Sequence, residues 1–228
     1  MNRGHYYLDH LSSERLRRCY EIAPARVKQY LESEVLHVLN NIHPSDAVLE
    51  LGCGYGRVLE ALAWKAKMLV GIDTSRSSLM LAKQKVGTLS HCHLFQMDGL
   101  ALAFRNQSFD DVICIQNGIS AFQVDPRDLV RESIRVTKKG GRVLFSTYSS
   151  NFWADRMEWF KLQADEGLIG EIDWDATGDG MIVCKDGFRA TAYGPPELLA
   201  LASQFDVKAE IKEVNGSSLF LEMRIGKS

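Results

Sequence analysis

The sequence predicts a doubly wound α/β fold, in which a mostly parallel sheet carries helices on both faces. Between residues 47 and 148, short apolar runs alternate with amphipathic helical segments, and such alternation favours parallel strands joined by right-handed crossovers. After residue 194 the alternation gives way to a helix and two strand-like runs separated by Asn215-Gly216, a strong hairpin signal. We therefore expect a seven-stranded sheet whose edge is completed by an antiparallel hairpin.

Each element is predicted from its own periodicity. The apolar residues between positions 25 and 42 recur at helical spacing until Pro44, which indicates an amphipathic helix. Strands are expected over residues 47–51, 68–72, 93–97, 111–116 and 140–148, with hairpin strands over 207–214 and 219–225. Further helices are expected over residues 57–67, 75–86, 125–138 and 195–204. Asp125 and Pro126 favour a helix start, because the carboxylate can accept from free amides and the ring presets the backbone.

Composition and charge narrow the range of functions. The 228 residues are 46% hydrophobic and 25% charged, as in an ordinary soluble protein with a self-sufficient core. A formal net charge of −2 gives no general attraction to nucleic acid, and no apolar run suits a signal peptide or a membrane span. The cysteines form no CxxC pair and are typical of reduced thiols in a cytoplasmic protein: Cys19, Cys53, Cys92, Cys114 and Cys184.

The most informative stretch is VLELGCGYGRV, at residues 48–58, where a strand is followed by Gly52, Gly54 and Gly56. Glycines allow a sharp turn and a close backbone approach to a ligand, and the following helix start offers free amides. A nicotinamide or flavin site would need a G-x-G-x-x-G spacing, but position 57 is Arg57. Glu50 would repel a pyrophosphate yet could hold an ammonium, which favours a zwitterionic amino-acid tail. A simple tight turn between strand and helix is the alternative.

Here the chain resembles the class I S-adenosylmethionine-dependent methyltransferases, whose first motif reads acid-x-Gly-x-Gly-x-Gly after the first strand. The resemblance continues in VGIDTS, FQMDGLALAF, SFDDVICIQN and TKKGGRVLFSTY. It covers residues 25–148 closely and about the last thirty residues by topology. The resemblance implies a Rossmann-like sheet, S-adenosylmethionine as the cofactor and methyl transfer as the activity.

The resemblance also implies residue roles. Glu50, Gly52 and Gly54 would lie beside the methionine portion of the cofactor, and Asp73 would accept both ribose hydroxyls. Asp98 would contact the adenine amino group, with Met97 and Gly99 bracketing the ring, and Gln116 and Asn117 would lie near the reactive methyl. The candidate cofactor-binding residues are thus Glu50, Gly52, Cys53, Gly54, Asp73, Thr74, Met97, Asp98, Gly99, Gln116 and Asn117. The alternative for each aspartate is a turn former or helix cap.

Recognition of the methyl acceptor falls to the remaining segments. We expect a single domain over residues 1–228, with an N-terminal helical lid region (1–45), a cofactor-binding core (46–148), a cap insertion (149–194) and a helix and hairpin that complete the core (195–228). No catalytic residue is assigned. Candidates near the site are the cap and the N-terminal side chains His5, Tyr6, Tyr7, His10 and Tyr20.

The cap is aromatic and acidic. Its aromatic residues are Trp153, Trp159, Trp174 and Tyr193, and its acids outnumber its bases: Asp155, Glu158, Asp165, Glu166, Glu171, Asp173, Asp175, Asp179 and Asp186 against Arg156, Lys161 and Lys185. Such a cap suits a small-molecule substrate that is cationic or neutral and disfavours nucleic acid. Core packing of the aromatics and a solvated acidic face are the commoner explanations.

Two weaker signals and several alternative functions remain open. His91 and His93 flank Cys92 without a third ligand, so no metal site is predicted. The RLRRCY segment could guide RNA, although a solvated helix face is the simpler interpretation. Alternative functions are RNA or protein methylation, a nicotinamide-dependent oxidoreductase, aminopropyl transfer and a non-catalytic cofactor-binding module. The acceptor and the oligomeric state do not follow from the sequence.

Overall fold

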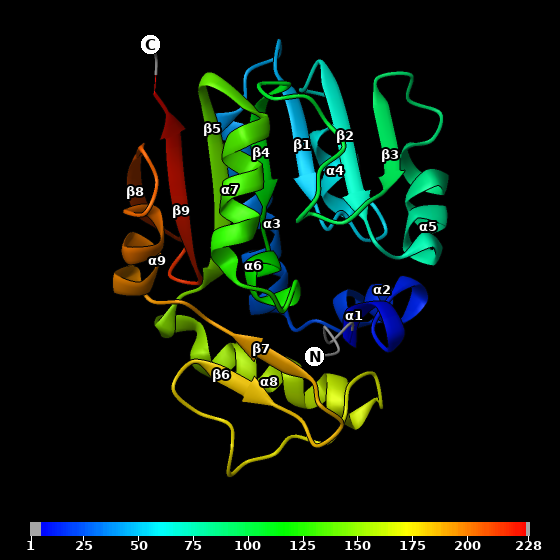
Figure 1. Cartoon of the computed structure of the whole chain (residues 1–228). Coiled ribbons are helices and arrows are strands. Elements are labelled where there is room, and N and C mark those ends of the chain that lie inside the picture. The colour runs from blue at the N-terminus through cyan, green and yellow to red at the C-terminus, as the bar shows by residue number, and fades with distance from the viewer. Residues whose placement is uncertain (1–5, 227–228) are drawn as a thin grey trace.

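The computed structural model describes residues 6–226 and has the predicted doubly wound architecture (Figure 1). The strands lie in the order β3 (Cys92–Gln96), β2 (Met68–Asp73), β1 (Ala47–Leu51), β4 (Phe109–Cys114), β5 (Thr137–Tyr148), β9 (Ser218–Ile225) and β8 (Val207–Val214). The first five pair in parallel, whereas β9 is antiparallel to both of its neighbours. The seven-stranded, mostly parallel sheet with an antiparallel hairpin strand is therefore confirmed.

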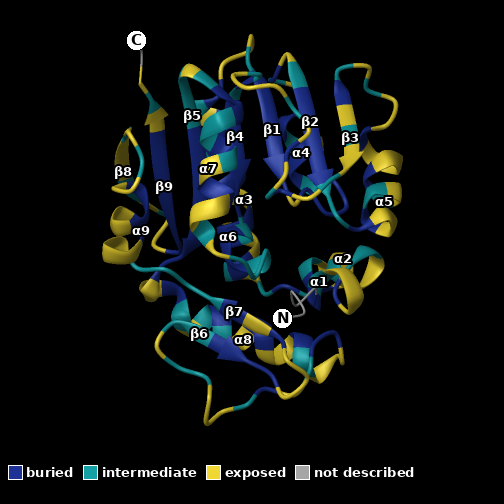
Figure 2. Ribbon diagram, viewed as in Figure 1, coloured by how far each residue is buried: buried dark blue, intermediate teal, exposed yellow. Residues whose placement is uncertain are grey.

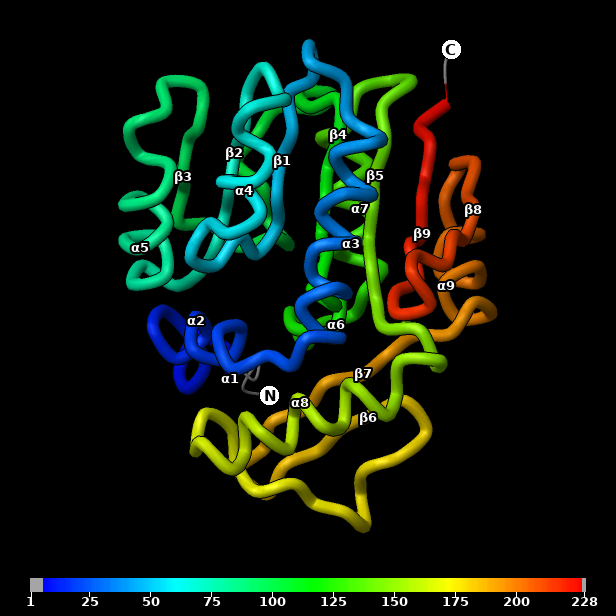
Figure 3. Tube along the Cα trace, turned by 180° about the vertical axis from the view of Figure 1, so that it is seen from behind, coloured from blue at the N-terminus to red at the C-terminus, as the bar shows by residue number. Residues whose placement is uncertain are grey.

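The helices cover both faces of this sheet. On one face lie α3 (Ala25–Asn41), α4 (Arg57–Leu62) and α5 (Arg76–Val86), which stand in front of the strands in Figure 3. On the other face lie α6 (Gly118–Ala121), α7 (Pro126–Val136) and α9 (Pro195–Ala202), seen in front in Figure 1. Each face has its own apolar core, and all five residues of β1 between the two cores are buried (Figure 2).

Several element boundaries differ from the sequence prediction, and helix α7 (Pro126–Val136) and helix α9 (Pro195–Ala202) each end two residues earlier than expected. Three further differences have a visible local cause. Helix α4 ends at Leu62 rather than 67, because the amides of Lys65 and Ala66 turn back onto the Leu62 carbonyl. Strand β4 ends before Gln116, whose φ of 59° is left-handed and redirects the chain into α6. Strand β5 begins at Thr137 rather than 140, with an irregularity in its pairing to the start of β4.

A further layer covers the carboxyl ends of the parallel strands (Figure 1). It combines α1 (Tyr6–Asp9) and α2 (Ser13–Glu21) with η1 (Ser150–Phe152), α8 (Trp153–Asp165), β6 (Met181–Val183) and β7 (Arg189–Thr191). These segments share a third apolar cluster, and the Trp159 indole donates to the Cys19 carbonyl at 2.8 Å. Arg15 donates to the carbonyls of Gly167 and Leu168 at 2.7 and 3.0 Å, so the N-terminal helices and the segment after β5 hold each other in place.

The remaining structural expectations concern cysteines, metals and membranes. All five cysteines are buried and unpaired, as small apolar side chains would be. His91 contacts the Ala63 carbonyl, and within the described chain no cluster of three metal-ligating side chains occurs. Over residues 6–226, no helix has both the length and the apolar character needed to cross a membrane.

Candidate functional site

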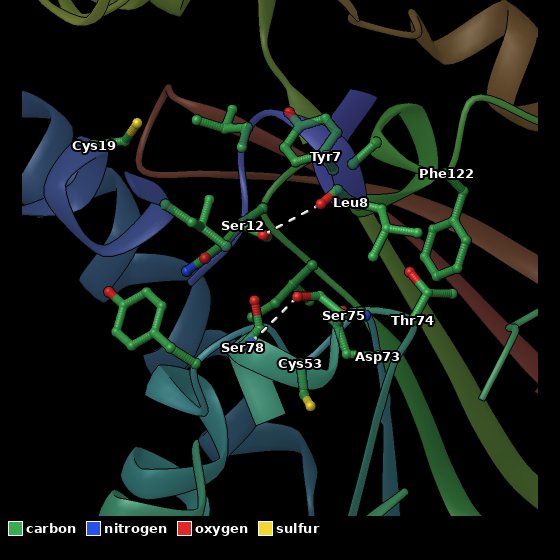
Figure 4. A pocket seen from close by; sticks show the side chains of 18 of the residues that line it. Tyr7, Leu8, Ser12, Cys19, Cys53, Asp73, Thr74, Ser75, Ser78 and Phe122 are labelled. Atoms are coloured by element: carbon green, nitrogen blue, oxygen red, sulfur yellow. Dashed lines mark hydrogen bonds between the residues drawn. The ribbon is translucent and has the colours of Figure 1, made fainter. Parts of the chain in front are cut away.

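A pocket lies between the carboxyl edge of the sheet and the layer that covers it. Side chains of the N-terminal helices, such as Tyr7 and Leu8, face Asp73 and Thr74 across this pocket (Figure 4). Eight of the eleven candidate cofactor-binding residues line it: Glu50, Gly52, Cys53, Asp73, Thr74, Met97, Asp98 and Gln116. This is the position at which open α/β sheets bind ligands, because the loops after neighbouring strands converge there.

The glycine turn after β1 adopts the backbone that its sequence suggests. Gly52, Gly54 and Gly56 all have positive φ, at 69°, 52° and 81°. Gly56 does not line the pocket; its Cα lies against α5, where an added Cβ would come within 3.0 Å of the Ala82 Cβ. Gly52 thus shapes the pocket wall, while Gly56 lets helix α4 pack closely on helix α5.

Asp73, at the end of β2, holds the loops on either side of the pocket. Its carboxylate accepts the amide of Gly54 at 2.9 Å and that of Ser75 at 2.8 Å. Burial raises the pKa of this carboxyl, while the two amides oppose the rise. Each oxygen retains a lone pair, so the same carboxylate can position the glycine turn and also accept a ligand hydroxyl.

Glu50 and Arg57 are an acidic and a basic side chain of the pocket, and each has spare hydrogen-bonding capacity. Glu50 is 5% exposed, and its Oε2 has no hydrogen-bond partner among residues 6–226. One terminal nitrogen of Arg57 is likewise buried without a partner in the described structure, and both side chains line the pocket. Burial raises the pKa of Glu50 to about 8; the Arg57 charge opposes this rise and the Asp73 charge adds to it. A ligand with both an ammonium and a carboxylate would satisfy both groups.

The sequence analysis did not single out Arg57 as a pocket residue and used it only to exclude a glycine at that position. Its guanidinium carbon lies 5.1 Å from the centroid of the Tyr20 ring, which comes from the N-terminal helices. The signal that could have found it is its place at the first position of the helix after the glycine turn.

An apolar slot lies beside Met97 and Asp98. The ring of Phe122, which follows α6, packs against the backbone of Gly52 and Gly99. A Cβ atom added to Gly52 would lie 3.4 Å from this ring, and one added to Gly99 would lie 2.7 Å from it. Phe122 lines the pocket (Figure 4). Asp98 accepts the Leu100 amide at 2.9 Å. A flat ring could lie between these apolar side chains. No sequence pattern singled out Phe122, because its position depends on how the loop after β4 folds back.

Three candidate cofactor-binding residues do not line the pocket. The Gly54 amide is taken by Asp73, and Gly99 lies behind the Phe122 ring. Asn117 is 5% exposed, and its Oδ1 accepts from the Thr147 hydroxyl at 2.8 Å, so its side chain is directed toward β5.

Gln116, the eighth lining residue, is held by its backbone. The backbone amide of Gln116 donates to Glu34 at 2.7 Å and to the Ser146 hydroxyl at 2.8 Å. Its side-chain Nε2 is buried and has no partner in the described residues. Burial raises the pKa of Glu34 to about 7, against hydrogen bonds that lower it.

The candidate N-terminal side chains separate into two groups. Tyr7 and Tyr20 line the pocket, whereas Tyr6 donates to Asp186 at 2.5 Å and His10 packs against the Tyr6 ring outside the pocket. His5 lies outside the described residues.

The cap contributes aromatic and amide groups to the pocket, not acids. Trp159, Phe160, Gln163 and Phe188 line it, while none of the nine acidic cap residues does. Trp174 is 61% exposed and lies away from the pocket, as do Trp153 and Tyr193. The expectation that the acidic residues would select a cationic acceptor therefore loses its basis: these carboxylates belong to a solvated outer face, as the commoner explanation holds.

Comparison with known proteins identifies the domain. Residues 48–141 match the family model described as a methyltransferase domain. The ubiquinone biosynthesis O-methyltransferase of Coxiella burnetii (strain RSA 493 / Nine Mile phase I) is 30% identical over 134 residues, covering 58% of this chain and 53% of that protein. The malonyl-[acyl-carrier protein] O-methyltransferase of Marinomonas sp. (strain MWYL1) is 32% identical over 146 residues, covering 61% and 52%. This chain thus spans about half the length of these relatives.

Solved structures share the fold. The PH0226 protein from Pyrococcus horikoshii OT3 superposes with a TM-score of 0.64 at 18% identity, covering 97% of this chain and 98% of that chain. The N-methyltransferase NodS from Bradyrhizobium japonicum WM9 in complex with S-adenosyl-L-homocysteine gives a TM-score of 0.61 at 16% identity, covering 94% and 97%. The family match, the strand order and the glycine turn with its acids agree, and together they support a methyltransferase domain of the class I S-adenosylmethionine-dependent type over residues 48–141.

Proposed function

We propose that this protein transfers the methyl group of S-adenosylmethionine to a small-molecule acceptor. The observation that carries this proposal is the pair of unsatisfied charged atoms, Glu50 Oε2 and an Arg57 terminal nitrogen, in a pocket beside Asp73. Glu50 would hold the ammonium and Arg57 the carboxylate of the methionine tail, and Asp73 would accept the ribose hydroxyls. Met97, Asp98 and Phe122 would hold the adenine.

The protein's own contribution is to bind, orient and exclude water. When bound, S-adenosylmethionine supplies an electrophilic methyl group on a sulfonium. We propose that residues 46–148 and 195–228 form the cofactor-binding core, that residues 1–45 form the lid region and that residues 149–194 form the cap. The contacts of Arg15 and Trp159 between lid and cap would keep the pocket closed, which favours reaction over loss to solvent.

A small molecule is favoured as the acceptor over nucleic acid. Arg15 and Arg18 contact residues 166–168 of the cap, and Arg17 pairs with Glu14 and Glu21, so these arginines do not form an unpaired basic patch. The relatives named above are O-methyltransferases, which supports methyl transfer as the activity.

Incubation with methyl-labelled S-adenosylmethionine and a cell extract tests the class of acceptor. After fractionation into small molecules, protein and RNA, we expect the label mainly in the small-molecule fraction, because the pocket is closed by lid and cap. Label recovered mainly in RNA, and lost when Arg15, Arg17 and Arg18 are all replaced by alanine, would contradict the proposal. Absence of label in every fraction would favour a non-catalytic binding module.

Glu50 should make cofactor binding release a proton. Because burial holds its pKa at about 8, Glu50 is mainly protonated at about pH 7 in the free protein, whereas pairing with an ammonium requires the carboxylate. Titration calorimetry with S-adenosylhomocysteine in two buffers of different ionisation enthalpy should show release of roughly one proton per ligand at about pH 7. Affinity should rise with pH until Glu50 is ionised.

The Glu50→Gln variant should abolish this release and weaken binding. Asp111→Asn is the matched control, because burial also raises the pKa of Asp111, to about 7, but this residue pairs with Arg142 away from the pocket. Its proton release should equal that of the unmodified protein. Binding by the unmodified protein without any proton release would contradict the assignment of Glu50.

A further inference from the structure

The part of the pocket built by lid and cap differs chemically from the part built by the sheet loops. Every charged side chain that lines the described pocket belongs to the sheet side: Glu50, Arg57, Asp73 and Asp98. From lid and cap, the opposite side presents the rings of Tyr7, Trp159, Phe160 and Phe188, and the ring of Tyr148 at the end of β5 adds to them. Aromatic walls of this kind suit a planar ligand. Given the proposed function, this side is where the methyl acceptor would lie.

A buried arginine lies directly behind this aromatic wall. Arg156 is 1% exposed, and its guanidinium carbon lies 4.3 Å from the centroid of the Tyr148 ring and 5.5 Å from that of Phe160. It donates to the carbonyls of Gly180 and Ala190 at 2.9 and 2.7 Å, its Nε has no partner in the described structure, and no carboxylate of residues 6–226 pairs with it. A buried cation without a counterion is costly, so an anion arriving nearby would be favoured.

The field of Arg156 reaches the pocket wall. Burial raises the pKa of the Tyr7 and Tyr148 hydroxyls, and the Arg156 charge opposes the rise in both cases. At Tyr148 the effect of the Arg156 charge on the pKa outweighs the smaller opposite effect of the Glu34 carboxylate. Tyr7 belongs to the lid and Tyr148 to the end of β5, so the positive potential extends across two sides of this part of the pocket. The same potential would favour the ionised form of a hydroxyl on a bound ligand.

Two amide groups complete the arrangement. Gln163 follows Arg156 by two turns of α8, lines the pocket at 3% exposure, and its Nε2 has no partner within the described chain. Gln116 Nε2, at the loop after β4, is also buried and unsatisfied. No carboxylate of the described residues lines this side of the pocket, and the buried Glu34 carboxylate behind Gln116 already accepts the Gln116 backbone amide and the Ser218 hydroxyl. Two unsatisfied donors and the Arg156 charge therefore complement an electron-rich oxygen rather than an ammonium.

We infer that the acceptor is a planar aromatic compound with a weakly acidic hydroxyl, held as its oxyanion by Gln163 and Gln116 in the field of Arg156 and methylated on that oxygen. The hydroxyl proton leaves to solvent as the compound binds. An oxygen lone pair then forms the new bond to the methyl carbon, and the electron pair of the broken carbon–sulfur bond stays on sulfur. Arg156 does not contact the acceptor, because the Tyr148 and Phe160 rings lie between them, and its charge acts at a distance. It is therefore a positioning residue and not a catalytic one.

Binding of three matched aromatic probes to protein saturated with S-adenosylhomocysteine tests this inference. At about pH 8, para-nitrophenol is an oxyanion, para-nitroaniline is neutral and para-nitrobenzylamine is a cation, all with similar rings. We expect para-nitrophenol to bind about tenfold or more tightly than para-nitroaniline, and the cation to bind most weakly.

Variants assign the preference to the residues named. Gln163→Leu and Arg156→Met should each reduce para-nitrophenol affinity about tenfold while changing para-nitroaniline affinity little. Arg156→Lys, which keeps the charge, should restore part of the loss. Lys161→Met is the matched control, because Lys161 is exposed on the same helix and pairs with Asp165 at 2.6 Å. It should leave the affinity of all three probes unchanged.

The outcomes separate this inference from the proposed function. If the protein binds S-adenosylhomocysteine but prefers the neutral or cationic probe, the inference is overturned and the proposed function stands. Full para-nitrophenol affinity in Gln163→Leu overturns it as well, and this variant decides the matter should Arg156→Met fail to fold. Failure of the unmodified protein to bind S-adenosylhomocysteine would instead overturn the proposed function.

Discussion

Replacement of Asp73 by alanine should weaken S-adenosylhomocysteine binding by about 1–3 kcal/mol, or roughly 5- to 150-fold. The ribose hydroxyls would lose a charged acceptor, and the amides of Gly54 and Ser75 would lose the group that positions the glycine turn. The fold should persist, because Asp73 lies at a strand end. Titration calorimetry together with circular dichroism measures both quantities.

Asp110→Ala provides the control for this change. Asp110 also accepts a backbone amide, that of Ala47 at 2.9 Å, but it lies at the start of β4 away from the pocket. Its replacement should leave ligand affinity unchanged. Equal affinity of Asp73→Ala and the unmodified protein, with an intact spectrum, would show that Asp73 does not hold the ligand.

Replacement of Gly56 by alanine should lower the free energy of unfolding by about 2–4 kcal/mol. The left-handed backbone at φ 81° costs an alanine about 1–2 kcal/mol, and the added Cβ would overpack against Ala82 in α5, which costs about as much again. Because Gly56 does not line the pocket, the folded variant should still bind S-adenosylhomocysteine. Urea unfolding monitored by circular dichroism measures the loss.

Gly216→Ala separates the two causes. Gly216 also has positive φ, at 59°, but an added Cβ there would meet no atom within 4 Å. This variant should lose only the backbone part, about 1–2 kcal/mol. If both variants lose the same amount, close packing of Gly56 against α5 contributes nothing.

The sheet and the position of its ligand edge were predictable because they depend on local patterns. The strand before Glu50, the glycine turn and the Asn215-Gly216 hairpin each carry their signal within a few neighbouring residues, and the structure has all of them. The residues at which the strands end were harder to predict. Whether Gln116 continues β4 or turns into α6 is decided by the buried Glu34 and Ser146, which are distant in sequence.

The side of the pocket that faces lid and cap could not be predicted from the sequence. Nothing in the sequence around Gln163 and Arg156 indicates that they lie near the pocket. Their position results from the packing of α8 against the N-terminal helices, through contacts such as that of Trp159 with Cys19. Composition suggested an acidic cap, but burial alone decides which of its side chains reach the pocket. For Asn117 the side chain is directed by Thr147, another distant partner.

Titration of the purified protein with S-adenosylhomocysteine and, separately, with NAD tests the central claim most directly. The account predicts micromolar binding of S-adenosylhomocysteine and no binding of NAD, because Glu50 and Arg57 match a zwitterionic tail, whereas a pyrophosphate offers no cation to Glu50. Binding of NAD without binding of S-adenosylhomocysteine would contradict the account and point to an oxidoreductase.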